Sequence, residues 1–182
     1  QFNHKINIFS VITLNPLPKF SHLFKSTFYS QKKINNDEPW ILHSKSSQFW
    51  FSRSTFAMLT IIQWYKEFSG NSKPVIWLPD YFCNEPLEFL KKLDITFNFY
   101  PITDSLNPNW DQCKTLAKTK KPDIFFLVHY FGKCNDIKNA KTFCDDINCI
   151  FVEDAAHVIQ PYAEIGKFSD FIFFSQHKLF AI

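Results

Sequence analysis

Two stretches in the second half of the sequence could act together, because the first contains an acid and the second contains a lysine. The first is Phe151-Val-Glu-Asp154-Ala-Ala-His157, and the second is Ser175-Gln-His-Lys178. Each follows or includes a short apolar run, so we expect Asp154 and Lys178 to lie where two strands end. This pair suits pyridoxal 5'-phosphate (PLP): the lysine amine forms a Schiff base with the cofactor aldehyde, and the acid keeps the pyridine nitrogen protonated.

The neighbours of this pair could assist the same chemistry. The two alanines after Asp154 are small enough to let a flat ring approach the backbone, and His157 could hydrogen-bond a ring substituent. Ser175 could offer its hydroxyl to a phosphate. Simpler interpretations exist for each residue: Asp154 could cap a following helix, His157 could be half-buried, and Lys178 could be an exposed loop lysine. Taken one at a time, these residues leave both interpretations open.

A second group of polar residues, Ser52-Arg-Ser-Thr55, stands at the start of a predicted helix over residues 54–68. Free backbone N–H groups and the helix dipole favour an anion at such a position. Ser54 and Thr55 add hydroxyls, and Arg53 could add positive charge. The group therefore predicts a phosphate site, although a serine that only caps the helix explains it as well.

Three residues follow other apolar runs in the same way. Tyr81 and Phe82 come after Pro79-Asp80, where one ring could stack on the cofactor. His129 follows the run 124–128 and could line the substrate side. In so aromatic a chain, packing in the core explains these residues equally well.

From about residue 39 onward, strand-like and helical patterns alternate. The predicted strands are 75–78, 95–100, 124–128, 149–152 and 171–174, and the predicted helices are 54–68, 85–93, 110–118 and 136–146. Apolar strands separated by helices are typical of a mostly parallel sheet covered on both faces. Ligands of such sheets bind outside the carboxyl ends of the strands, where all the candidate residues fall. We expect an irregular segment over residues 1–38 and one domain over residues 39–182.

The composition narrows the class of protein. The 182 residues can hold one ordinary domain, and 23 phenylalanines with only 3 glycines exclude a low-complexity chain. A net charge of +3 with scattered lysines argues against nucleic-acid binding. Five cysteines without zinc-type spacing indicate a reduced, cytoplasmic setting and no metal site. The run 6–14 is shorter than the roughly 18 residues of a membrane span. Because the sequence starts at Gln1 and stops at Ile182, we expect a fragment.

The order of these segments resembles the DegT/DnrJ/StrS sugar aminotransferases, over roughly residues 40–182. The segments that carry the resemblance are the hydroxyl-rich helix start, Pro-Asp-Tyr-Phe82, Val128-His-Tyr-Phe-Gly132, Val152-Glu-Asp-Ala-Ala-His157 and Ser169-Asp-Phe-Ile-Phe-Phe-Ser-Gln-His-Lys178. The resemblance implies an α/β fold: the three-layer α/β/α large domain of PLP-dependent transferases, related to aspartate aminotransferase. It also implies truncation before a small C-terminal domain.

The resemblance implies roles for individual residues. Asp154 would contact the pyridine nitrogen, and His157 would take the place of the usual glutamine beside the ring hydroxyl. Ser175 would bind phosphate, and Lys178 would carry the internal aldimine. Two positions depart from the family pattern. The lysine commonly lies five residues after the serine, where this chain has Phe180, and Ser52 replaces the glycine of the phosphate loop.

The resemblance implies a PLP-dependent aminotransferase that moves an amino group from an amino acid, such as glutamate, to a keto sugar, which we expect to be nucleotide-linked. The resemblance also implies a homodimer in which the partner subunit completes each active site. Because a partial sheet without the small domain leaves the site open to water, we expect this chain to be inactive alone. Two alternatives remain: a non-catalytic PLP-fold binding protein, and a PLP-dependent sugar dehydratase. In the dehydratases a histidine replaces the lysine, so Lys178 argues against them, although His177 is adjacent.

Overall fold

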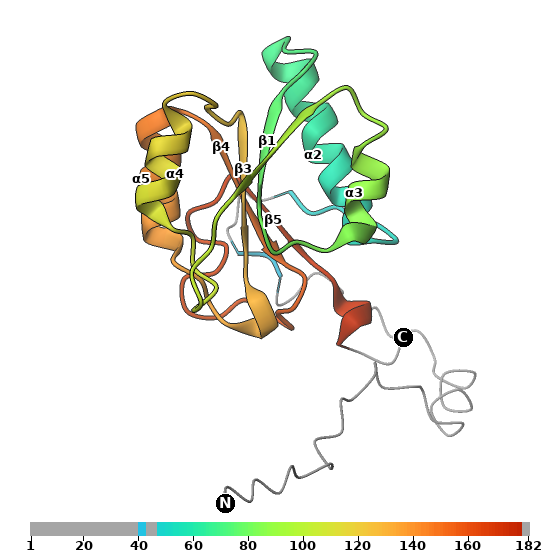
Figure 1. Cartoon of the computed structure of the whole chain (residues 1–182). Helices are drawn as coiled ribbons and strands as arrows, with labels where there is room; N and C mark the ends of the chain where they lie inside the picture. Colours follow the sequence, from blue (N-terminus) through green and yellow to red (C-terminus); the bar gives the residue numbers. More distant parts are fainter. Residues whose placement is uncertain (1–39, 43–46, 180–182) are drawn as a thin grey trace, which may run out of the picture.

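Strands and helices alternate along the part of the chain that the computed structural model describes, residues 40–42 and 47–179 (Figure 1). The strands are β1 (Val75–Pro79), β2 (Thr96–Tyr100), β3 (Ile124–Val128), β4 (Ile150–Ala155) and β5 (Phe171–Phe174). The helices are α2 (Ser54–Ser69), α3 (Asn84–Leu90), α4 (Trp110–Ala117) and α5 (Ile137–Ile147), with 3-10 turns η1 (Tyr130–Gly132) and η2 (Gln176–Lys178). The segment 1–38, predicted to be irregular, lies outside the described residues.

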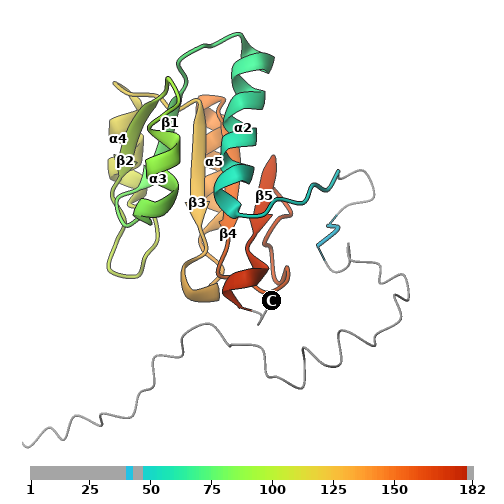
Figure 2. The same cartoon turned by 90° about the vertical axis from the view of Figure 1, so that its right-hand side faces the viewer.

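All five strands form one parallel sheet in the order β2-β1-β3-β4-β5. Helices α2 and α3 cover one face, and α4 and α5 cover the other, so the sheet is the middle of three layers (Figures 1 and 2). A parallel sheet needs both faces covered because each connection between its strands crosses one face. The predicted fold class, a mostly parallel α/β sheet, is confirmed.

The phenylalanine-rich core is divided by the sheet. In β3, Phe125 and Leu127 pack against α4 and α5, while Ile124 and Phe126 pack against α2 and α3. Successive side chains of a strand point to opposite faces, so a strand buried on both faces must be apolar at every position. All four side chains have no exposed surface. The continuous apolar run therefore marked the centre of the sheet.

The last part of β4 differs from the prediction. The predicted strand ends at residue 152, but β4 continues through Ala155 because it pairs on both sides, with Val128 opposite Asp154 on β3 and Phe173 opposite Asp154 on β5. Asp154 therefore lies within the strand. No helix occurs between β4 and β5, where every residue is described, so the alternative that Asp154 caps a helix is wrong.

The start of α2 also differs in detail. Neither Ser52 nor Ser54, the two candidate caps, caps this helix. Arg53 occupies the N-cap position in extended conformation, and no described side chain caps the helix. The N–H of Phe56 bonds to the carbonyl of Arg53 at 3.1 Å. The N–H groups of Ser54 and Thr55, in the first turn, have no acceptor within the helix itself and could bond to a ligand. None of the helices in the described ranges is long and apolar enough to cross a membrane.

Candidate cofactor pocket

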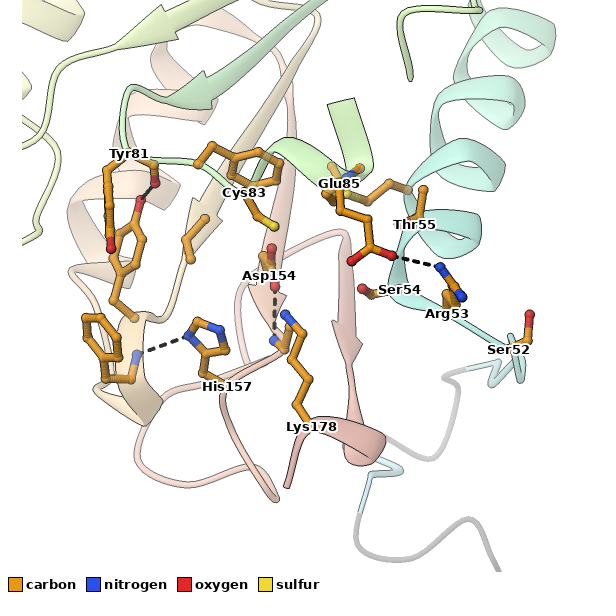
Figure 3. Close-up of a pocket in the computed structure, with 17 residues that line it drawn as sticks. Ser52, Arg53, Ser54, Thr55, Tyr81, Cys83, Glu85, Asp154, His157 and Lys178 are labelled. Atoms are coloured by element: carbon orange, nitrogen blue, oxygen red, sulfur yellow. Dashed lines mark hydrogen bonds and ion pairs between the residues drawn. The ribbon is translucent and has the colours of Figure 1, made fainter. Parts of the chain in front are cut away.

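A pocket of about 560 Å³ opens at the carboxyl end of the sheet. Its walls come from the start of α2, the segments after β1 and β3, the end of β4 and the turn after β5 (Figure 3). They comprise Ser52, Arg53, Ser54, Thr55, Met58, Tyr81, Phe82, Cys83, Glu85, Pro86, Val128, Tyr130, Phe131, Asp154, Ala156, His157 and Lys178. In open α/β sheets, ligands bind at this edge, where neighbouring strands lead their connections to opposite faces. The structure thus brings together most of the residues predicted from sequence.

Asp154 is the buried acid of the pocket. Its side chain is almost fully buried, and its Oδ1 accepts the N–H of Ala156 at 2.9 Å. Burial raises the pKa of Asp154 because it disfavours the charged form. The Ala156 N–H, then the nearby charges of Lys178 and His157, act in the opposite direction. A carboxylate this deeply buried is stabilised when a cationic ligand atom lies beside it, because the ligand then compensates the buried charge.

Lys178 reaches the same pocket from the turn that follows β5. Its backbone N–H bonds to the carbonyl of Ser175 at 3.1 Å, which closes the turn η2. Figure 3 shows the side chain rising from this turn towards Asp154. The two residues are close because β4 and β5 are paired neighbours, so their carboxyl ends meet. Phe180, the alternative position for the family lysine, lies outside the described residues.

His157 stands beside Asp154 as a hydrogen-bond donor. Its Nδ1 accepts the N–H of Phe131 at 3.2 Å, and the two rings stack with centroids 5.9 Å apart. Burial, and then the charge of Lys178, lower the pKa of His157, so the ring is neutral near pH 7. Because Nδ1 accepts, the ring hydrogen lies on Nε2. Figure 3 shows this nitrogen on the side of Asp154 and Lys178.

The start of α2 forms the opposite wall of the pocket, and Ser52, Arg53, Ser54 and Thr55 all line it. Its uncapped N–H groups and helix dipole can hold an anion. Arg53, however, forms an ion pair with Glu85 at 2.8 Å, and both side chains are largely exposed. Sequence reasoning missed Glu85, because nothing in the sequence relates α3 to the start of α2.

Aromatic residues form the third wall. Tyr81 and Phe82 line the pocket as expected, and so does Tyr130, which the sequence reasoning did not single out. The hydroxyl of Tyr130 donates to the carbonyl of Tyr81 at 2.6 Å, and the two rings lie 5.6 Å apart. Tyr130 and Phe131 come directly after His129, so the same strand-end signal that selected His129 was available for them.

The structure does not bring two predicted residues to the pocket wall. His129 is fully buried; its Nε2 lies 2.7 Å from Glu153 Oε2, and its Nδ1 accepts the N–H of Asn135 at 3.1 Å. Both ring nitrogens are therefore engaged away from the pocket. Ser175 is also buried and is not among the lining residues. No cluster of three or more metal-binding side chains occurs in the described residues.

Solved structures share this fold. The chain is similar to Helicobacter pylori PseC, an aminotransferase of pseudaminic acid biosynthesis, with a TM-score of 0.57 and 22% identity over 71% of this chain and 35% of that one. It is also similar to Bacillus subtilis NtdA with bound cofactor PMP (0.53, 17%, covering 65% and 26%) and to DesI with its TDP-sugar product (0.51, 21%, covering 67% and 31%). The fold is the α/β fold of PLP-dependent aminotransferases. The chain spans about a third or less of the length of these structures.

The match to a protein family is more specific. Residues 102–181 match the model of the DegT/DnrJ/EryC1/StrS aminotransferase family. The matched range includes Asp154, His157 and Lys178, and it confirms the resemblance to this family. No curated protein matches the chain.

Proposed function

We propose that this chain carries the cofactor site of a PLP-dependent aminotransferase, which transfers an amino group from an amino acid to a nucleotide-linked keto sugar. One observation carries the proposal: Asp154, Lys178, His157 and the uncapped start of α2 line a single pocket. The family match over residues 102–181 supports the same class of reaction.

The donor set of the pocket fits the parts of PLP. The start of α2 suits the phosphate, Asp154 suits a protonated ring nitrogen, and the Nε2–H of His157 suits the ring oxygen. Lys178 supplies the amine. When bound, PLP supplies an aldehyde that bonds to amines and a ring that withdraws electrons from the bonded carbon.

Each residue would act through a property that its surroundings create. Asp154 would hold a proton at the pyridine nitrogen, and burial makes a cationic partner favourable for its carboxylate. His157 would replace the glutamine of the family, because its neutral ring offers one N–H as an amide does. Lys178 Nζ would bond to the cofactor and later carry the proton that the substrate carbon releases.

The substrate side is proposed from the rim of the pocket. Tyr81 is 58% exposed and Phe131 is 74% exposed, so both present free ring faces to solvent. Such faces can pack against the apolar side of a sugar ring. We further propose a homodimer in which the partner subunit completes the site, on the basis of the family resemblance. A cytoplasmic location is proposed from the five cysteines without zinc-type spacing.

The test is whether PLP bonds to Lys178. We expect added PLP to produce a long-wavelength absorbance band, and borohydride reduction followed by peptide mass spectrometry to find the cofactor on Lys178. Lys178→Ala should abolish the bond, whereas Lys167→Ala, at an exposed lysine between β4 and β5, should leave it intact. Attachment that survives in Lys178→Ala would refute the assignment. PLP binding without conversion when amino donors are added would favour the non-catalytic alternative.

A further inference from the structure

His129 and Glu153 form a buried pair that the proposed chemistry does not use. The two side chains have no exposed surface, and His129 Nε2 lies 2.7 Å from Glu153 Oε2. Glu153 precedes Asp154 in β4, so these two acids point to opposite faces of the sheet. Asp154 lines the pocket, whereas Glu153 points to the face that α4 and α5 cover. Burying polar groups so deeply costs free energy of folding unless they are hydrogen-bonded, so we ask what this pair does for the protein.

The hydrogen bonds around the pair determine where its hydrogens lie. The N–H of Asn135 donates to His129 Nδ1, so the ring hydrogen must be on Nε2, from which it is donated to Glu153. The N–H of Gly166 donates to both oxygens of Glu153, at 3.1 Å each. Glu153 therefore accepts at both oxygens, which is the role of an ionised carboxylate.

This network ties together the segments around the pocket. Asn135 follows the turn η1, and Gly166 lies within the connection 156–170 between β4 and β5. Gly166 has a φ of 79°, and a Cβ at this position would overlap the side chain of Leu42. Leu42 therefore leaves no room for a side chain at the position whose N–H bonds to Glu153. Glu153 holds the connection 156–170 directly, and it holds the segment after η1 through His129.

Both of these segments act on His157. This residue lies at the start of the connection 156–170, and its Nδ1 accepts an N–H from η1, that of Phe131. Phe131 has a φ of 53°, a left-handed conformation that is strained in a residue other than glycine and persists only where its surroundings hold it. The network supplies such support, because His129 and Asn135 flank this turn on either side.

We propose that His129 and Glu153 are positioning residues: they hold the turn η1 and the connection 156–170 so that the Nε2–H of His157 faces the pocket. The inference rests on the proposed function, since it assigns His157 to the cofactor. The pair does not touch the cofactor and acts through His157.

The first measurement is made on the wild-type chain and requires no cofactor. In the full chain labelled with ¹⁵N-histidine, two-bond ¹H–¹⁵N spectra distinguish the two neutral forms of each histidine from the charged form. Signals are assigned with single histidine variants. We expect the Nε2–H form at both His129 and His157. A charged His129, or one with its hydrogen on Nδ1, would overturn the proposal.

The second measurement uses Glu153→Gln. The amide keeps the size of the side chain but replaces one accepting oxygen with an NH2 group, which must then face the N–H of either His129 or Gly166 as a second donor. We expect the signals of His157 to move although that residue is unchanged. We also expect the affinity for PLP to fall by roughly threefold to tenfold, as when one hydrogen bond to the cofactor is misplaced.

Glu164→Gln is the matched control. Glu164 lies in the same connection and pairs with Lys138 at 2.9 Å on the surface, so the same substitution there should leave the His157 signals and PLP affinity unchanged. If Glu153→Gln does not fold, Glu153→Asp keeps the charge but shortens the side chain, and it should still move the His157 signals from their wild-type positions. A folded Glu153 variant with unchanged His157 signals would overturn the proposal.

If the wild-type chain does not bind PLP, the proposed function fails, and the cofactor-free spectra still decide the positioning role.

Discussion

Removing one hydroxyl from the pocket tests whether the segments after β1 and β3 form one wall. The hydroxyl of Tyr130 donates to the carbonyl of Tyr81 at 2.6 Å, and the Tyr130 side chain is buried. Burial, and then the charges of Asp154 and Asp80, raise the pKa of Tyr130, so the phenol keeps its hydrogen at neutral pH and donates it. Tyr130→Phe deletes this donor and keeps the ring.

The expected loss of stability follows from the bond that disappears. Losing this part-buried hydrogen bond leaves the carbonyl of Tyr81 without its donor, at a cost of about 1 to 2 kcal/mol of unfolding free energy. With a urea dependence of about 2 kcal/mol per molar, the unfolding midpoint should fall by about 0.5 to 1 M. The wall also becomes less rigid, so the affinity for PLP should fall by about twofold to fivefold.

Two further tyrosine variants separate the wall from stability in general. Tyr100→Phe deletes a buried hydroxyl that donates to the carbonyl of Phe126 at 2.8 Å, away from the pocket. It should cost a similar free energy of unfolding and leave the PLP affinity unchanged. Tyr81→Phe deletes a hydroxyl from an exposed ring and should change the unfolding free energy by less than about 0.5 kcal/mol. Equal losses of PLP affinity in Tyr130→Phe and Tyr100→Phe would refute the reasoning.

Other substitutions test the remaining parts of the pocket. Burial raises the pKa of Asp154, so the folded chain binds this proton more tightly than the unfolded chain, and stability is lost as pH rises through that window. Asp154→Asn should therefore gain stability relative to wild type in thermal unfolding as the pH rises above about 4, the usual pKa of an aspartate, while losing PLP binding. A stability difference that does not move in favour of the variant as the pH rises would contradict this sign. Thr55→Val should weaken binding of PLP but not of pyridoxal, which lacks the phosphate. Equal weakening of both ligands in a binding titration would show that the start of α2 does not bind the phosphate. His157→Gln should keep PLP affinity within about threefold, whereas His157→Leu should lower it by about tenfold, because only glutamine can donate to the ring oxygen.

Much of the fold could be predicted because its strands are unusual. A strand covered on both faces must be apolar at consecutive positions, and the run 124–128 shows this directly. The end of β4 could not be predicted in the same way. In the sequence, Glu153 and Asp154 look like the end of the apolar run, yet both are buried in the structure. Glu153 pairs with His129, and Asp154 lines the pocket. Pairing with two neighbouring strands, which local sequence does not reveal, extends β4 beyond the predicted end.

The sequence by itself determined which residues stand at the carboxyl ends of the strands, because each candidate follows or closes an apolar run. It therefore selected Asp154, His157 and Lys178 as one group. Only the tertiary structure decided what each residue faces. In the folded chain His129 bonds to Glu153 instead of lining the pocket, and Glu85 forms an ion pair with Arg53. The physical reason is that strand order and side-chain hydrogen bonds depend on contacts between distant segments. Local patterns predict the strands, but only the packed sheet determines their neighbours.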